Sequence, residues 1–245
     1  MKAIEVNSQP SKELKVGADH SREMVEWRRP IENSPLNPRW REECSLHTSP
    51  FEWGLIRVFF TCEFASALAK SFPQEGFKFA SYGGDSQGFY YRHLISNGVI
   101  HNSVLELEPS WKILAKLLAS QEYARGLAEL VGLRNVRGLK VDCALAVYNS
   151  GCWLKPHTDR EHRILTQVIY LNDGWDPKFG GFLRLLNSER LDDVAEEVVP
   201  TLNTSVIFRR SDRSWHAVMP VHPEQGSDRK LIRRSVLFHL SSVGT

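Results

Sequence analysis

The chain has 245 residues, of which 42% are hydrophobic and 24% charged, so one large domain can bury a substantial core and an intrinsically disordered chain is not expected. The formal net charge is +2 and the sequence pI is about 8.3, and the sequence has no block of like charges. This charge pattern gives no support for a nucleic-acid partner. No stretch approaches the roughly 20 apolar residues of a membrane span, and the N-terminus lacks the apolar segment of a secretion signal.

The cysteines favour a reducing compartment. Four of them, Cys44, Cys62, Cys143 and Cys152, show no Cys-x-x-Cys spacing, and the chain is too long to need disulfide bonds for stability. Free thiols are therefore expected, and the chain is predicted to be a soluble cytoplasmic protein.

The first 50 residues are polar and are interrupted by five prolines, a composition that suits neither a helix nor a central strand. We predict an irregular N-terminal segment over residues 1–50, mobile over about the first 20 residues, with Trp27 and Trp40 packed on the surface of the main domain. A single domain is predicted over residues 51–245, with its core at 136–241.

The first regular elements are predicted just after this segment. Residues 51–60 alternate like a strand, and Thr61 is placed to cap a helix that ends at Pro73. A glycine-rich turn at 83–88 lacks the spacing of a phosphate-binding loop. Residues 89–93 then form either a half-buried strand or, through Tyr90 and Arg92, part of a substrate pocket wall.

The second half of the chain is predicted to be rich in strands. Two helices over residues 110–131, capped by Ser110 and Ser120, should brace the sheet from outside. Strands without intervening helices follow, which favours an antiparallel sandwich or barrel. The expected class is mostly β with flanking helices (α+β), with strands at 138–148, 164–171, 181–186, 204–208, 215–221 and 231–240.

Three residues form a candidate metal site. His157 and Asp159 lie two apart, so on an extended backbone their side chains point the same way, and His216 follows 57 residues after Asp159. Two histidines and one carboxylate make the facial triad of non-haem Fe(II) oxygenases. A structural zinc site is the chemical alternative, but it would normally need four ligands, and Cys152 has no thiol partner nearby in the sequence.

Further motifs surround the triad: Tyr148-x-x-Gly151, Gly180-Gly181, Trp215-His216 and Arg233-x-Ser235-Val236. With them, the chain resembles the 2-oxoglutarate and Fe(II)-dependent dioxygenases, and within these the prolyl 4-hydroxylase-like group. The resemblance is most specific between Tyr148 and Leu240 and looser from Phe51 onward. It implies a double-stranded β-helix (jelly-roll, cupin-like) core, with Fe(II) as the metal and 2-oxoglutarate and O2 as co-substrates.

The resemblance also implies roles for single residues. His157, Asp159 and His216 would bind the iron, and Arg233 would clamp the distal carboxylate of 2-oxoglutarate with its bidentate fork. The other residues implied at the 2-oxoglutarate pocket are Tyr170, Tyr148, Leu183 and Ser235.

The sequence departs from the group in two places. Arg233 follows His216 by 17 residues, a longer spacing than usual, because of an extra loop at 222–228, so Arg229 and Arg234 remain alternatives for the clamp. His239 and Leu240 replace an aromatic pair that is often found there.

The expected reaction is hydroxylation of an unactivated C–H bond, with 2-oxoglutarate converted to succinate and CO2. Related halogenases have Gly or Ala in place of Asp159, so the retained carboxylate favours hydroxylation, or desaturation, over halogenation. We expect a small polar substrate, such as an amino acid or a biosynthetic intermediate. The candidate substrate contacts are Tyr90, Arg92, Trp153, Arg160, Arg213 and Trp215.

Three other functions stay open. A peptidyl or protein hydroxylase of the prolyl or aspartyl type is the first. Nucleic-acid alkylation repair is the second, although its Arg-x-Asn-x-Thr-x-Arg signature is not reproduced after Arg233. The third is a non-catalytic binding module, against which the intact ligands and clamp argue; the oligomeric state is left open.

Overall fold

The computed structural model describes residues 34–83, 87–134, 138–222 and 231–242. The chain divides into two compact units, Met1–Glu32 and Asn33–Thr245, and every described residue lies in the second. The predicted mobility of the N-terminus, the packing of Trp27, and the extra loop with Arg229 fall outside the described residues.

The second unit begins earlier than the domain boundary predicted at residue 51. Leu36 and Trp40 are buried in its core, and Leu36 bridges to Phe60. The first strand, β1 (Ser45–His47), pairs with β2 (Trp53–Ile56). Residues 34–50 therefore fold as part of the domain.

The helices begin close to where the sequence predicts. The hydroxyl of Thr61 accepts a hydrogen bond from the backbone N–H of Phe64, and Ser120 does the same for Tyr123, which confirms both as N-caps. No helix among the described residues is long and apolar enough to cross a membrane. The helices are α2 (Cys62–Lys70), α3 (Pro109–Ala119) and α4 (Gln121–Leu130), with short 3-10 helices η1 (Asn102–Glu106) and η2 (Pro177–Phe179).

The start of α3 corrects one prediction. Its N-cap is Glu108, and Pro109 occupies the first helical position, so Ser110 lies inside the helix. Proline suits that position because its missing N–H would have no intrahelical partner there.

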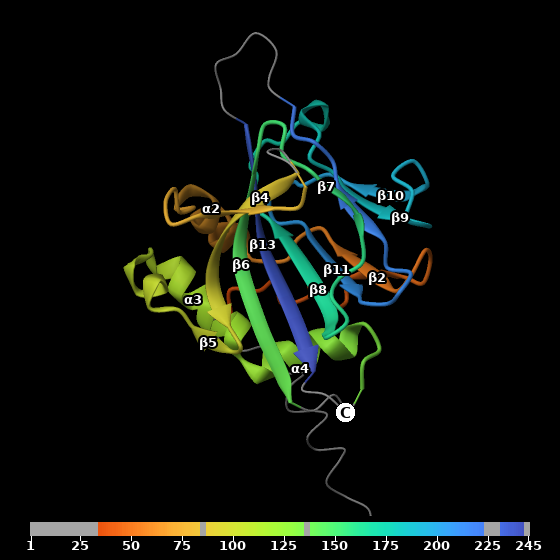
Figure 1. The fold of residues 1–245 in the computed structure, drawn as a ribbon. Helices are drawn as coiled ribbons and strands as arrows, with labels where there is room; N and C mark the ends of the chain where they lie inside the picture. The colour runs from red at the N-terminus through yellow and green to blue at the C-terminus, as the bar shows by residue number, and fades with distance from the viewer. Residues whose placement is uncertain (1–33, 84–86, 135–137, 223–230, 243–245) are drawn as a thin grey trace, which may run out of the picture. The chain divides into compact units, whose positions relative to one another are not determined.

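The strands form two antiparallel sheets (Figure 1). The large sheet runs β1-β2-β11-β8-β13-β6-β4-β3, with β5 beside β4, and the small sheet runs β10-β9-β12-β7. This confirms the predicted class of a mostly β protein with the two-sheet arrangement of a double-stranded β-helix. The remaining strands are β3 (Lys78–Ser81), β4 (Gly88–Ser96), β5 (Val99–Ile100), β6 (Leu139–Asn149), β7 (Leu154–His157), β8 (Arg163–Tyr170), β9 (Leu183–Leu186), β10 (Val194–Val198), β11 (Ser205–Arg209), β12 (His216–Val218) and β13 (Ile232–Ser242).

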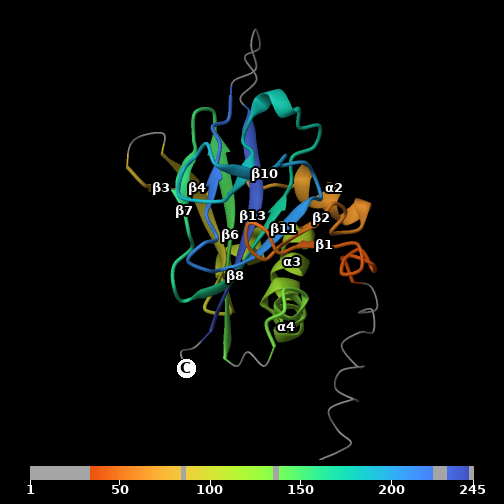
Figure 2. The same ribbon diagram turned by 90° about the vertical axis from the view of Figure 1, so that its right-hand side faces the viewer.

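The large sheet separates two hydrophobic cores. Along β8, Leu165 and Ile169 belong to the core that also contains residues of the helices, whereas Val168 and Tyr170 belong to the core shared with the small sheet. Alternate residues of a strand face opposite sides, so one strand serves both cores. Figure 2 shows α3 and α4 along one side of the large sheet and β7 on the other. The polar residues described next lie between the sheets.

Candidate metal and 2-oxoglutarate site

The three predicted metal ligands come together. His157 is the last residue of β7 and His216 the first of β12, and the two stand opposite each other in the pairing of these strands. Asp159 lies in the loop just beyond β7. One possible ligand atom from each residue lies within 4.8 Å of the others, and the two imidazole centroids are 4.2 Å apart. This is the facial arrangement that the sequence predicts.

Backbone carbonyls orient both histidines. The Nδ1 atom of His157 lies 2.9 Å from the carbonyl oxygen of Lys155, and the Nδ1 of His216 lies 2.9 Å from that of Ser214. A carbonyl oxygen can only accept a hydrogen bond, so each Nδ1 carries a proton, and Nε2 is the nitrogen that each ring can offer to a metal. Metal-binding histidines usually donate their second N–H in this way.

Two side chains hold the carboxylate of Asp159, which is 7% exposed. The Arg163 guanidinium donates to one oxygen and the Thr166 hydroxyl to the other, each at 2.6 Å. Burial raises the pKa of Asp159, but electrostatic interaction with His216, His239 and Arg163 and the hydrogen bond from Thr166 outweigh it and hold this pKa well below its usual range. The carboxylate is therefore ionised and ready to ligate a cation.

The buried His216 makes the metal-free protein sensitive to acid. Burial, reinforced by the neighbouring His157 and opposed by Asp159, lowers the pKa of His216 to about 4. Between the unfolded value of about 6.5 and 4, the unfolded chain binds a proton that the folded protein does not, so stability falls as the pH falls. We expect His216 alone to cost about 3 kcal/mol at the acid end of this range.

Thermal melts of the metal-free protein from pH 7 to pH 4 check this prediction. His239 acts in the same direction, because burial lowers its pKa to about 3. A melting temperature that stays constant between pH 6.5 and pH 4.5 would contradict it.

A second polar cluster surrounds Arg233, whose side chain is 1% exposed. Its Nε donates to the carbonyl oxygen of Gly181 at 2.8 Å and one terminal nitrogen lies 3.4 Å from the Ser235 hydroxyl. The guanidinium carbon lies 4.8 Å from the ring centroid of Tyr148 and 5.0 Å from that of Tyr170. Among the described residues, no carboxylate forms an ion pair with Arg233.

Two further features fit an anion beside Arg233. The buried Tyr170 hydroxyl has no well-formed hydrogen bond within the described ranges. Gly181 has φ +68°, and a Cβ there would lie 3.1 Å from the Arg233 side chain, so glycine makes room for the guanidinium. A buried charge is costly unless an opposite charge pairs with it, so the cluster is suited to a carboxylate ligand.

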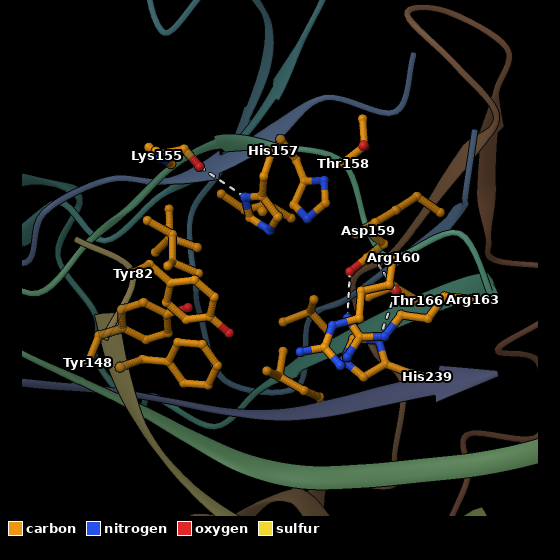
Figure 3. Close-up of a pocket in the computed structure, with 18 of the residues that line it drawn as sticks. Tyr82, Tyr148, Lys155, His157, Thr158, Asp159, Arg160, Arg163, Thr166 and His239 are labelled. Atoms are coloured by element: carbon orange, nitrogen blue, oxygen red, sulfur yellow. Dashed lines mark hydrogen bonds and ion pairs between the residues drawn. The ribbon is translucent and has the colours of Figure 1, made fainter. Parts of the chain in front are cut away.

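The triad and this cluster line one cavity of about 280 Å³ (Figure 3). Three of the predicted 2-oxoglutarate contacts line it, namely Tyr148, Leu183 and Arg233, while Tyr170 and Ser235 pack against Arg233 from behind. Arg234 faces away, over the Phe72 ring on the helix side of β13. Of Arg233 and Arg234, Arg233 is therefore the one that reaches the cavity; Arg229 lies outside the described residues.

The structure separates the predicted substrate contacts. Arg160 lines the cavity, but the other five do not. Arg92 instead donates to the carbonyls of Glu75 and Ser103, and Tyr90 packs on Phe79. The remaining three, Trp153, Arg213 and Trp215, also lie outside the lining.

Several lining residues were not predicted from the sequence. Tyr82 and Lys155 lie at the cavity with His157 and Arg160 (Figure 3). Tyr82 stacks on Phe89 with a centroid distance of 6.2 Å, and Phe89 stacks on Tyr148 at 5.2 Å. Arg163, which also lines the cavity, was not predicted either. The feature of the sequence that could have pointed to it is its position four residues after Asp159.

Comparison with known proteins agrees with this geometry. Residues 143–238 match the family described as the 2OG-Fe(II) oxygenase superfamily. A 93-residue stretch is 37% identical to prolyl 3,4-dihydroxylase OGFOD1 of Ostreococcus tauri, covering 34% of this chain and 18% of that protein. The matched stretch thus spans about a fifth of the curated relative.

Two solved structures share the fold. A prolyl-4-hydroxylase from Pseudomonas putida has a TM-score of 0.56 at 22% identity, covering 78% of this chain and 93% of that one. A prolyl hydroxylase from Trichoplax adhaerens, solved with a hypoxia inducible factor peptide, has a TM-score of 0.58 at 15% identity, covering 78% and 83%. The family match places residues 143–238, which include the intact triad, in the 2-oxoglutarate and Fe(II)-dependent oxygenase superfamily, and the two solved structures share the fold of the domain.

The residues present fit the group that this superfamily uses. Two imidazoles and one carboxylate leave coordination positions open on Fe(II), and the buried cation beside them suits 2-oxoglutarate. The family match over residues 143–238 and the triad therefore imply Fe(II), 2-oxoglutarate and O2 for this site.

Proposed function

We propose that the protein is a 2-oxoglutarate-dependent dioxygenase that hydroxylates an unactivated C–H bond of a small polar substrate. The observation that carries the proposal is the buried guanidinium of Arg233, which has no carboxylate partner among the described residues and lines the same cavity as the triad. When bound, Fe(II) and 2-oxoglutarate supply the oxidising power: one oxygen atom of O2 enters the substrate and the other enters succinate, with release of CO2.

The protein contributes binding and orientation. His157, Asp159 and His216 present two imidazoles, each through Nε2, and one carboxylate to the metal. Arg233 holds the distal carboxylate of 2-oxoglutarate, and the rings of Tyr148 and Tyr170 flank the guanidinium and keep water away from this ion pair.

The charges at the cavity support an anionic substrate. Besides Arg163 and Arg233, which have their own roles, the charged residues that line it are Lys155, Arg160 and Asp159. Because Asp159 serves the metal, the remaining charge offered to a substrate is positive. A carboxylate-bearing molecule of amino-acid size matches this charge and the cavity volume of about 280 Å³.

A second candidate is hydroxylation of a prolyl residue within a peptide. The names of the Ostreococcus, Pseudomonas and Trichoplax proteins favour it. The exposed Tyr82 and its stack with Phe89 also favour it, since proline rings pack well on aromatic faces.

The first test uses binding alone. We expect Mn(II) and 2-oxoglutarate together to raise the melting temperature of the metal-free protein by about 5 °C or more at saturating concentrations, because ligands that bind only the folded state stabilise it. Absence of any stabilisation would contradict the dioxygenase and favour a binding module with another ligand.

Substrate-dependent succinate release, with a 16-Da mass gain, then separates the candidates. The panel contains free amino acids, their methyl esters and proline-containing peptides. Activity on free acids but not on esters supports the anionic small substrate, whereas activity on peptides alone supports the prolyl candidate.

A further inference from the structure

We infer that Thr166 and His239 are positioning residues that fix the Asp159 carboxylate for metal binding. The inference rests on the proposed function, because it concerns the same metal site. The Thr166 hydroxyl lies 2.6 Å from Oδ2 of Asp159 and 2.9 Å from Nδ1 of His239. The three side chains thus form a chain of two hydrogen bonds that ends on a metal ligand.

Only one assignment of donors and acceptors fits these two hydrogen bonds. Asp159 is ionised and can only accept, so Thr166 gives its single hydroxyl proton to the carboxylate. The Thr166 oxygen must then accept from His239, which carries its proton on Nδ1. Hydrogen bonds in such a series polarise and strengthen one another.

The large sheet fixes Thr166 and His239. Thr166 on β8 and His239 on β13 are directly paired in register, and both side chains lie on the face of the large sheet that lines the cavity. A directly opposed pair in an antiparallel sheet brings side chains within contact distance without a loop rearrangement. The chain of hydrogen bonds is therefore anchored on rigid strands, whereas Asp159 itself stands in a loop.

Because Thr166 and His239 stand on strands and Asp159 in a loop, the first two can hold the Asp159 carboxylate in place. Arg163 holds Oδ1 of Asp159 and Thr166 holds Oδ2, so rotation of the carboxylate is restrained from both sides. His239 in turn occupies a lone pair of the Thr166 oxygen, which directs the hydroxyl proton toward Asp159. Loss of hydrogen bonds behind a metal ligand typically lowers metal affinity by about 10- to 100-fold.

The test is a Co(II) titration of the full-length protein, with affinity read from calorimetry and geometry from the d–d absorption bands. Thr166→Val and His239→Leu remove the donors, whereas Thr166→Ser keeps the hydroxyl and His239→Asn keeps an N–H. We expect the Val variant to bind Co(II) about 10- to 100-fold more weakly, with shifted bands, and the Leu variant to weaken in the same direction. The Ser and Asn variants should stay within about threefold of wild type, which a merely structural role would not require.

Thr204→Val is the matched control, since Thr204 is also buried and bonded to another hydroxyl, that of Thr201, outside the cavity lining. If wild type binds Co(II) and both the Val and Leu variants bind equally well with unchanged bands, the inference is overturned while the proposed function stands. Wild-type protein that binds no metal overturns the proposed function, and the inference with it.

Discussion

Replacement of His216 by alanine is expected to abolish substrate-dependent succinate release while the protein stays folded. His216 supplies one of three ligand atoms from the first residue of β12, and Nδ1 is already committed to Ser214. Removing a residue behind a ligand costs about 10- to 100-fold, so loss of the ligand itself should cost more than about 100-fold. The measurement is single-turnover succinate release with Fe(II) at a fixed concentration.

His101→Ala is the control for this variant. His101 is also a partly buried histidine with one hydrogen bond, to Ser96, but it lies outside the cavity lining. It should keep wild-type turnover. Unchanged turnover in the His216 variant would refute the triad as the iron site.

Replacement of Arg233 by methionine should separate binding of 2-oxoglutarate from folding. Truncating one partner of a buried charge pair costs 2–5 kcal/mol or more, so the KM for 2-oxoglutarate should rise by roughly 30-fold or more. The ligand-free protein, in contrast, should keep its stability within about 2 kcal/mol, because methionine removes a buried cation that has no carboxylate partner in the described part of the chain.

Arg234→Gln is the matched control, one residue along β13 and on the opposite face over Phe72. It should leave the KM for 2-oxoglutarate unchanged. If Arg233→Met keeps the wild-type KM for 2-oxoglutarate, Arg233 does not bind this co-substrate. A large loss of stability in the ligand-free Arg233→Met protein would instead indicate a structural role.

Strand alternation explains why so much of the site could be predicted. On β13, Arg233, Ser235 and His239 share the cavity face because they are separated by even numbers of residues. On β6 and β8 the same rule puts Tyr148 and Tyr170 toward Arg233. These orientations depend only on the alternation of side chains along a strand, so they can be predicted from the spacing of residues in a sequence motif.

The residues that were missed depend on packing between distant segments. Tyr82 follows β3 and reaches the cavity by stacking on Phe89 of the neighbouring β4, which in turn stacks on Tyr148, and no local spacing encodes that approach. The edge strand β10 was missed because its Glu196 and Glu197 are exposed and its register shifts after Val194. Such an irregular edge weakens the alternation by which strands are recognised.

The same limit bears on the predicted substrate contacts that do not line the cavity. Trp153, Arg213 and Trp215 lie next to glycine or metal-ligand motifs in the sequence, but neighbours on a strand point to opposite faces. Trp215 precedes His216 directly and therefore faces away from the cavity that His216 lines. Nearness along the chain favoured all three residues. Alternation accounts for Trp215, which directly precedes His216, whereas Arg213 lies in the turn before β12.

The division of the triad between the sheets has a mechanical consequence. His157 and His216 belong to the small sheet, whereas Asp159 is bound through Thr166 to β8 of the large one. A metal held by all three would act as a cross-link between the two layers, so its release would free them to move relative to each other. Occupancy of the site would in this way restrain the two sheets at the cavity that the triad lines.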